Sequence, residues 1–553
     1  MQLVKNAKLY NFSYNKQNLK GGENMLRSIA TITIFVSTAY AQIVWMDYQT
    51  TGCVSCHRIA SVKMSDTLYI FGTFHYNNNK MNPFLIAVDS SLNIKWYKAF
   101  SHNFLGNSAI DNMVKINDSL IAISGGHSSR QGQCQNYNNY NNCTFFGIFN
   151  IKTQNFVWAR YRQANLNNWH MSATAIDFDG NNLVIGAQST MDTYGSWLLK
   201  VNLNGSIQWQ KIIYRGQSIE FSVMDVIFDG ANYVYLFRSG VDGGDNISLV
   251  KLDLNGNLRW AKDYDFGKFE YPYKLLRDAD GYVVVGFKCH SGTCSSLDSI
   301  DNILIFKTDT AGNISWSKLY SSNIPGWLRK YRAYNIALDY DGNYLVSGFV
   351  RATSNSSYPI VLKINRNNGN LIWARYWDTP PLNTNSNKGA GVISIGQGKF
   401  YLLTFIGSGA DASRGFAIIR EDTARPDACT KSLSMSASSP SPTVSPLGVT
   451  INNASYPVNN LSLSSYNPNI NQVSSCEITP ISNYEYIKSC DYEIRPQRNY
   501  IEISLKRKKN VYIYNVVGKV VYRDEFEGKR RIKLKDGIYV IKLDNEKFKV
   551  VVK

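Results

Sequence analysis

The chain has 553 residues, of which 44% are hydrophobic and 18% charged, and Lys plus Arg exceed Asp plus Glu by 18. Its length predicts more than one domain. The positive charge is concentrated in the tails, because residues 1–41 hold five basic side chains against one acidic and residues 484–553 hold 18 against 10. This distribution disfavours nucleic-acid binding, and we expect no nucleic-acid partner.

A secretory signal peptide is predicted at residues 25–41. Met25-Leu26-Arg27 opens a basic and then apolar run that ends in Ala39-Tyr40-Ala41, a small-x-small cleavage pattern. The mature chain then begins at Gln42, and residues 1–24 reflect a start codon assigned too early. No other segment is long and apolar enough to span a membrane.

Seven tryptophans recur in the pattern apolar-x-Trp followed by a polar and aromatic run. Successive intervals are 51, 62, 51, 51, 56 and 57 residues. A period near fifty with insertions predicts a solenoid or propeller. The seven are Trp45, Trp96, Trp158, Trp209, Trp260, Trp316 and Trp373.

Each repeat is predicted to be a four-stranded antiparallel blade. In the fourth repeat, strands are expected at 221–227, 233–237 and 247–253, and a fourth strand starts at 258. Ser239 to Asn246 is expected to be a polar loop. Asp-Gly and Asn-Gly pairs, such as Asp229-Gly230 and Asn255-Gly256, predict two-residue hairpin loops. Long helical periodicity is absent, so the fold class is all-β.

The two ends of the repeat region complement each other. The last repeat, from about Lys388 to Arg420, lacks a Trp strand, whereas Ile43 to Tyr48 is a Trp strand without preceding partners. We therefore expect the N-terminal strand to complete the last blade, which closes a seven-bladed β-propeller over residues 42–428.

Nine cysteines suit an exported protein. Two loop insertions each carry one close pair, and a further pair brackets the region after the propeller, with Cys490 left over. Disulfides are therefore candidates at Cys134 and Cys143, at Cys289 and Cys294, and at Cys429 and Cys476, although spacing does not determine the pairing.

Cys53-Val54-Ser55-Cys56-His57 matches the Cys-x-x-Cys-His attachment pattern of haem c, in which two thioethers hold the porphyrin and the His ligates iron. His57 lies twelve residues after Trp45, and His170 lies twelve after Trp158 without cysteines beside it. Cys53 and Cys56 can therefore equally form a disulfide, bind a metal or remain thiols. The sixth iron ligand would be Met64, His75, His102 or His170.

Other motifs favour structural roles. Asp278-Ala279-Asp280-Gly281 and Asp339-Tyr340-Asp341-Gly342 resemble the start of a calcium loop but lack its downstream Glu, so hairpin turns are the favoured interpretation. The tryptophans are interpreted as packing anchors between blades, with carbohydrate stacking as the alternative. We identify no catalytic residue.

Residues 429–483 are rich in Ser, Asn and Pro and predict a mostly extended linker with some strand character. Residues 484–553 predict a small β-sandwich-like module, with a strand-turn-strand unit at 511–521 and further strands at 535–541 and 548–553.

The module carries three spaced elements in order: Ile-Tyr-Asn-x-x-Gly-Lys-x-Val, Gly-Ile-Tyr-Val-Ile and Lys-Val-Val-x-Lys. Together they resemble the type A C-terminal sorting domain of the type IX secretion system. The resemblance implies export through the outer membrane of a Bacteroidota-type cell, cleavage near this domain, and release or fixation to lipopolysaccharide. The residues that carry it include Tyr514, Asn515, Gly518, Gly537, Tyr539 and Lys553.

The sequence therefore predicts an exported, secreted or cell-surface propeller that resembles the bacterial quinoprotein-like class and binds a ligand or partner. Its partners are the type IX secretion machinery and, given the basic stretches 506–509 and 529–531, anionic surface polysaccharide or lipopolysaccharide. One alternative is an extracytoplasmic cytochrome with a single haem c, which Soret absorbance would reveal. The other is a secreted hydrolase acting on polysaccharide or peptide.

Overall fold

The computed structural model describes 42–47, 60–77, 80–101, 108–126, 135–136, 139–140, 143–163, 173–188, 195–216, 220–241, 244–267, 269–290, 301–325, 327–353, 356–377, 390–407, 413–424, 430–455, 458–466, 472–474, 487–488, 492–497, 500–515, 520–534, 537–544 and 546–552. These segments contain strands and turns and no helix. The chain divides into residues 1–38 and 39–553, and every described residue belongs to the second unit. No helix suited to crossing a membrane was found in the described segments.

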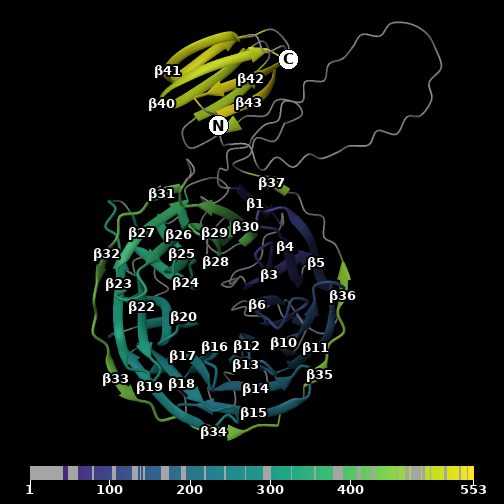
Figure 1. Ribbon diagram of the computed structural model, residues 1–553, viewed down its shortest axis with the longest axis vertical. Coiled ribbons are helices and arrows are strands. Elements are labelled where there is room, and N and C mark those ends of the chain that lie inside the picture. Colours follow the sequence, from purple (N-terminus) through teal and green to yellow (C-terminus); the bar gives the residue numbers. More distant parts are fainter. Residues whose placement is uncertain are drawn as a thin grey trace, which may run out of the picture. The chain divides into compact units, whose positions relative to one another are not determined.

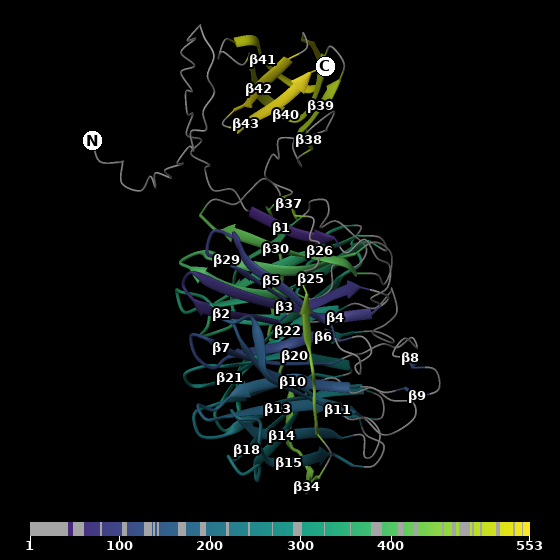
Figure 2. The same ribbon diagram turned by 90° about the vertical axis from the view of Figure 1, so that its right-hand side faces the viewer.

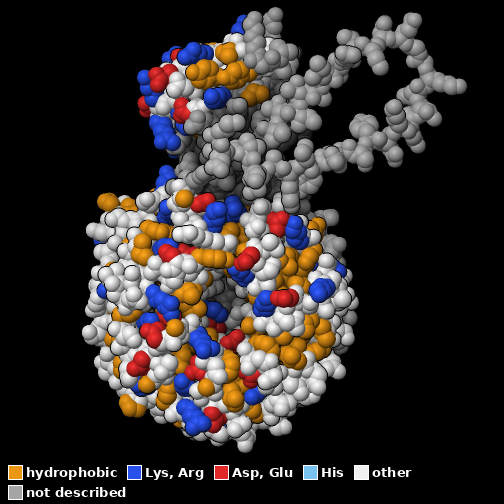
Figure 3. Space-filling view, in the orientation of Figure 1, with side chains coloured by type: hydrophobic (Ala, Val, Ile, Leu, Met, Phe, Trp, Pro, Cys, Tyr) orange, Lys and Arg blue, Asp and Glu red, His pale blue; other side chains and the backbone are white. Residues whose placement is uncertain are grey.

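Seven antiparallel blades stand side by side in a ring (Figure 1), and the space-filling view shows a hollow at its centre, here called the channel (Figure 3). Blades 1 to 3 follow the order of the chain. Blade 1 is β2 (Ala60–Ser65), β3 (Leu68–Asn77), β4 (Lys80–Val88) and β5 (Ile94–Ser101); blade 2 is β6 (Ala109–Lys115), β7 (Leu120–Gly126), β10 (Cys143–Asn150) and β11 (Asn155–Gln163), with the small hairpin β8 (Gln135–Asn136) and β9 (Asn139–Tyr140) inserted; blade 3 is β12 (Ala173–Phe178), β13 (Asn182–Gln188), β14 (Ser196–Asn202) and β15 (Ile207–Tyr214).

Blades 4 to 7 repeat the pattern. Blade 4 is β16 (Phe221–Phe228), β17 (Tyr233–Val241), β18 (Gly244–Leu252) and β19 (Leu258–Asp265); blade 5 is β20 (Phe269–Arg277), β21 (Gly281–Cys289), β22 (Asp301–Asp309) and β23 (Ile314–Ser321); blade 6 is β24 (Lys330–Leu338), β25 (Tyr344–Thr353), β26 (Ser356–Ile364) and β27 (Leu371–Trp377); blade 7 is β28 (Ala390–Gly396), β29 (Lys399–Gly407), β30 (Ser413–Asp422) and β1 (Gln42–Asp47).

The closure predicted from the sequence is confirmed. β1 pairs antiparallel with β30, from Gln42 opposite Arg420 to Asp47 opposite Gly415. Blade 7 is thus completed by the first described strand of the chain, which joins the two ends of the propeller.

The middle strands are apolar on both faces because each blade is covered on both sides by its neighbours. Val283, Val284 and Val285 are all fully buried. Val284 packs with blade 4 residues such as Leu236, whereas Val283 and Val285 pack with blade 6 residues such as Val346. The propeller core therefore consists of layers between blades, and each layer is a separate hydrophobic cluster.

The turn predictions are confirmed in part. Asp229 N–H donates to Asn232 O (3.0 Å), which leaves a two-residue loop that starts at Gly230. Asn255-Gly256 instead belongs to a five-residue connection between Leu252 and Leu258, in which Gly256 N–H donates to Asp253 O (2.9 Å). The predicted polar loop at 239–246 is also wrong at both ends, since Ser239 pairs with Asn246 inside the β17–β18 ladder.

The Ser/Asn/Pro-rich region is more ordered than its composition suggests. The described residues between 430 and 474 (430–455, 458–466 and 472–474), here called the strap, run along the outside of the ring and add a fifth strand to every blade (Figures 1 and 2). The strap visits blades 6, 5, 4, 3, 2, 1 and 7 in that order. Its strands are β31 (Thr430–Ser432), β32 (Ser436–Ser438), β33 (Thr443–Pro446), β34 (Thr450–Asn453), β35 (Asn459–Asn460), β36 (Ser464–Tyr466) and β37 (Gln472–Ser474).

The C-terminal region forms a separate sheet with its own core. The predicted strand-turn-strand unit is present, because Tyr514 pairs with Val520. Two of the recognised motifs also meet in space, since Asn515 pairs with Tyr539. The strands are β38 (Ile487–Lys488), β39 (Tyr492–Gln497), β40 (Tyr500–Asn515), β41 (Val520–Lys533), β42 (Gly537–Leu543) and β43 (Glu546–Val552).

Candidate functional site

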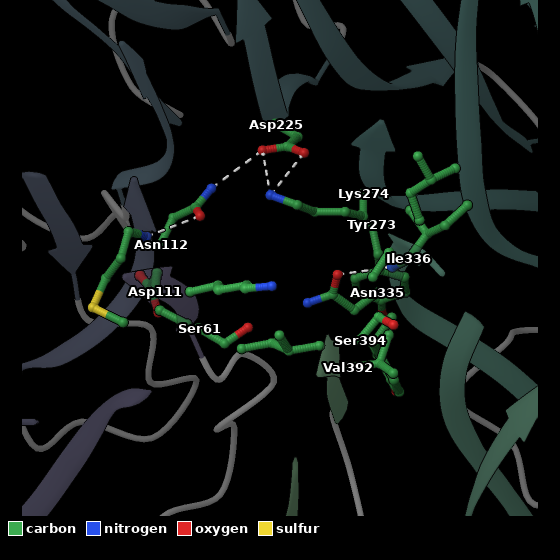
Figure 4. Close-up of a pocket in the computed structure, with 17 residues that line it drawn as sticks. Ser61, Asp111, Asn112, Asp225, Tyr273, Lys274, Asn335, Ile336, Val392 and Ser394 are labelled. Atoms are coloured by element: carbon green, nitrogen blue, oxygen red, sulfur yellow. Dashed lines mark hydrogen bonds and ion pairs between the residues drawn. The ribbon is translucent and has the colours of Figure 1, made fainter. Parts of the chain in front are cut away.

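The innermost strand of each blade lines the channel, and in several blades this strand contains a β-bulge. The pairing register shifts just before Asn112 in β6, Asp225 in β16, Lys274 in β20 and Asn335 in β24. A bulge places one extra residue in the strand and redirects the following side chain. All four side chains point into one cavity at the centre of the ring (Figure 4).

Asp225 organises one side of this cavity, although its residue is only 1% exposed. Its carboxylate lies 3.0 Å from Lys274 Nζ and accepts a hydrogen bond from the Leu275 backbone N–H (2.9 Å). Asn112 Nδ2 donates to the same carboxylate at 3.2 Å. These contacts join blades 2, 4 and 5, and they balance the buried negative charge with a half-buried ammonium group.

Asp177, on the inner strand of blade 3, is a second carboxyl group beside this cluster. Burial raises its pKa to about 6, and the nearby Asp225 charge acts in the same direction. The Phe228 backbone N–H donates to its Oδ2 at 2.6 Å and favours the charged form. The residues around Asp225 therefore include a group that titrates just below neutral pH.

Asn335 presents its amide group to the cavity. Its Oδ1 accepts a hydrogen bond from the Ile336 N–H (2.7 Å), which leaves the amide nitrogen directed inward (Figure 4). The cavity has a volume of about 370 Å³ and is also lined by Ser61, Ala337 and Ser394. In the space-filling view, Lys, Arg, Asp and Glu side chains surround the hollow at the ring centre (Figure 3).

The tryptophans are packing anchors, as predicted. Trp158, Trp209 and Trp316 each donate a hydrogen bond from Nε1 to a backbone carbonyl in the following blade, at 2.8, 3.1 and 3.2 Å. Gly256 lies against the Trp209 ring with a φ of 76°, and a Cβ at this glycine would approach the ring to 3.4 Å. The regular spacing of Trp in the sequence thus reflects a repeated contact between blades.

The two calcium-like segments are hairpin turns closed by lysine. Lys307 Nζ lies 2.8 Å from Asp278 and 2.6 Å from Asp280, and Lys363 Nζ lies 2.7 Å from Asp339. Within the described segments, no group of three or more His, Cys, Asp or Glu side chains is arranged to hold a metal ion. The Asp278 N–H donates to Gly281 O and the Asp339 N–H donates to Asn343 O, so both segments form turns between paired strands.

Most residues predicted to carry redox chemistry fall outside the described residues. This applies to Cys53, Cys56 and His57, and to Cys134, Cys294, Cys429 and Cys476, so haem attachment and the disulfides stay predictions. The sorting-motif residues Gly518 and Lys553 also lie outside. Cys143 begins β10, and Cys289 ends β21 with its side chain buried.

Met64, one of the candidate sixth ligands of a haem iron, does not have its side chain at the channel surface. Its side chain is 3% exposed and belongs to the hydrophobic cluster between blades 1 and 2. It therefore serves as core packing in this fold.

Sequence reasoning did not identify Asn112, Asp225, Lys274 and Asn335. They form no local motif, because 49 to 113 residues separate each one from the next. Their common signal is their position on the inner strands of blades 2, 4, 5 and 6, which an alignment of the repeats to one another would have revealed.

Comparison with known proteins identifies the C-terminal region. Residues 495–553 match the family described as the secretion system C-terminal sorting domain. No curated protein matches the chain. This match starts after the boundary of 484 expected from the sequence, and it includes both described motif strands, β40 and β42.

Solved structures similar to the chain share little sequence with it. The quinohemoprotein alcohol dehydrogenase ADHIIG from Pseudomonas putida HK5 is 10% identical with a TM-score of 0.37, over 65% of this chain and 66% of that one. A protein of unknown function from Dyadobacter fermentans DSM 18053 is 9% identical with a TM-score of 0.37, over 69% and 98%. Sqt1 from Chaetomium thermophilum is 9% identical with a TM-score of 0.31, over 68% and 100%.

The matched domain, the motifs that resemble the type IX sorting signal and the strand pairing of the ring agree with one another. The chain therefore carries a type IX C-terminal sorting domain after a seven-bladed β-propeller, and it is a secreted or cell-surface protein.

Proposed function

We propose that this protein is a binding protein whose ligand site is the central cavity of the propeller. The observation that carries the proposal is the convergence of Asn112, Asp225, Lys274 and Asn335, from four different blades, on one cavity of about 370 Å³. Small-molecule sites are typically cavities of a few hundred Å³ with a few convergent polar groups.

The charge balance of the cavity favours an uncharged ligand rich in hydroxyl groups. Asp225 and Lys274 already neutralise each other, Lys63 is paired with Asp66 at 2.7 Å, and Asp111, which also lines the cavity, likewise has an interaction partner. The neutral polar groups that line the cavity include the Asn335 amide and the Ser61 hydroxyl (Figure 4). Hydroxyl groups both donate and accept hydrogen bonds, so a small neutral saccharide matches these groups better than an ion does.

A calorimetric titration against a panel of neutral mono- and disaccharides tests the proposal. We expect one member of the panel to bind the wild-type chain, and Asn335→Ala to raise its Kd at least about tenfold through loss of a buried hydrogen-bond donor. Asn117→Ala, in an exposed turn outside the cavity, is the control and should bind as the wild type does. Absence of binding across the panel, or equal affinity in both variants, would contradict the proposal.

We also propose that the sorting domain has affinity for anionic surface polymers such as lipopolysaccharide. Lys506, Arg507 and Lys508 are exposed on β40, and Lys529 and Arg530 are exposed on the paired strand β41. A group of basic side chains on one hairpin attracts polyanions, and salt screens that attraction.

The second proposal predicts a measurable loss of binding to vesicles that contain purified lipopolysaccharide. A Lys506→Gln, Arg507→Gln, Lys508→Gln triple variant should bind at least about tenfold more weakly at low salt, and the difference should shrink at high salt. Lys98→Gln combined with Lys211→Gln and Lys262→Gln, on the propeller, is the matched control. Equal loss in both triple variants would show that only total charge matters, and the proposal would then fail.

A further inference from the structure

The strap follows a seven-residue period that matches the blades one by one. In six blades, the residue three positions after the repeated Trp pairs with a strap residue. From one blade to the next, this strap partner moves seven positions along the sequence. The pairs are Tyr376 with Lys431, Leu319 with Ser438, Asp263 with Ser445, Ile212 with Asn452, Tyr161 with Asn459 and Ala99 with Tyr466.

The same period appears in the backbone contacts between blades. Leu433, Leu447 and Leu461 each donate their N–H to the carbonyl of the residue after a Trp, at 2.9, 3.0 and 2.8 Å. Pro440 occupies the same phase but has no N–H, and there the Ser317 hydroxyl donates to the Pro440 carbonyl instead. At these four positions the strap is hydrogen-bonded to its blade, including at Pro440, where the sequence departs from the pattern.

Apolar side chains attach the strap to the ring at the same phase. Leu433, Leu447 and Leu461 are 4, 7 and 7% exposed, and each belongs to a different cluster between blades. Seven residues in extended conformation span about 23 Å, at about 3.3 Å per residue. Each seven-residue step brings the strap to the equivalent position of the neighbouring blade, so one step along the outer edge is at most about that long.

The last strap strand lies on the N-terminal strand. Seven positions after Tyr466, Val473 pairs with Trp45, flanked by Gln472 opposite Met46 and Ser474 opposite Val44. β1 is therefore paired along both edges, with β30 on one side and β37 on the other.

The first strap strand is connected to the same blade. Thr430 Oγ1 donates to Glu421 of β30 at 3.1 Å, and Trp377 Nε1 of blade 6 donates to the same buried carboxylate at 3.3 Å. The strap therefore begins beside blade 7 and ends on it, after one full circuit of the ring.

We propose that the strap is a clamp that keeps the propeller closed, and that docking of β37 holds the N-terminal strand β1 in blade 7. β1 is joined to the rest of the ring by strand pairing at a single short ladder with β30. A second ladder, with β37, adds three paired residues to the six that pair with β30, and it covers the outer edge of β1. Opening of the ring at β1 then requires release of the strap first.

Hydrogen exchange on the full-length chain tests the clamp with one substitution type at two positions. Val473→Pro removes a backbone N–H from β37 on blade 7, and Val444→Pro does the same in β33 on blade 4. We expect Val473→Pro to accelerate exchange in the 42–47 fragment at least about tenfold, and Val444→Pro to leave that fragment at the wild-type rate.

Exchange in β17, measured in the same experiment, reports on the rest of the ring. Loss of β17 protection in Val473→Pro alone would also support the clamp, because it would show that the ring opens when β37 is released. Equal exchange of the 42–47 fragment in the wild type and both variants, or equal acceleration in both variants, would overturn the proposal.

Discussion

Replacing Glu270 by Gln is expected to abolish most of the loss of stability that the propeller undergoes as the pH rises from about 5 to about 9. Glu270 lies on β20 and is fully buried, and neither carboxylate oxygen has a hydrogen-bond partner in the described part of the chain. Burial raises the pKa of this carboxyl group to about 9, assisted by the negative charge of Asp265.

The sign of the pH effect follows from the proton that the folded state retains. The folded state binds this proton up to about pH 9, whereas the unfolded chain releases it near the ordinary glutamate pKa of about 4.5. The free energy of unfolding is therefore highest below that value and falls by up to about 1.4 kcal/mol per pH unit above it.

Urea unfolding measured from pH 5 to pH 9 tests this prediction. Gln resembles the protonated acid but does not ionise, so Glu270→Gln should exceed the wild type in stability by up to about 5 kcal/mol at pH 8. Glu527→Gln, at an exposed position on β41, is the control and should keep the wild-type slope. The same slope in Glu270→Gln as in the wild type would show that Glu270 is ionised in the folded state.

Asp225→Ala is expected to destabilise the propeller by about 2 kcal/mol, because it leaves the buried Leu275 N–H without its acceptor and the half-buried Lys274 ammonium without its partner. The substitution removes the acceptor for Lys274, Asn112 and the Leu275 N–H together. Equilibrium unfolding in urea at neutral pH measures the loss.

The matched control is a second Asp–Lys pair with an exposed carboxylate. Asp280 lies 2.6 Å from Lys307 Nζ, but its side chain is 69% exposed, and such pairs contribute about 1 kcal/mol or less. If Asp225→Ala cost no more than Asp280→Ala, the channel cluster would not be a structural element of the ring.

Much of the architecture was predictable because its signals are local and repeated. Trp158, Trp209 and Trp316 each donate to a backbone carbonyl of the next blade, so the spacing of Trp reports the blade repeat. The closing strand was predictable from counting, since the last repeat lacks a Trp strand and Ile43 to Tyr48 supplies one.

The channel cluster was not predictable from local patterns. Asn112 and Asp225 are 113 residues apart and meet only because the ring brings inner strands together. Bulges in those strands determine which side chains point inward, and the residues at equivalent positions differ between blades. A search for the features that all repeats share therefore misses a site formed by residues that differ between the blades.

The strap was predicted only as an extended linker with some strand character because its composition resembles that of unfolded linkers. Its period is nevertheless present in the sequence, with Leu433, Leu447 and Leu461 spaced by 14 residues. The spacing of 14 residues can be interpreted only once the strap is known to follow the blades, because 14 residues are two seven-residue steps and carry the strap past two blades.

The central claim is that residues 430–474 are part of the folded propeller, and hydrogen exchange of the wild-type chain tests it most directly. Backbone amides that pair with an outer strand are protected from exchange, whereas those of a solvated linker exchange freely. We predict protection of strap fragments such as 443–453 comparable to that of β19 and β15, with which they pair. Complete exchange of those fragments within seconds, while β19 and β15 stay protected, would contradict the account.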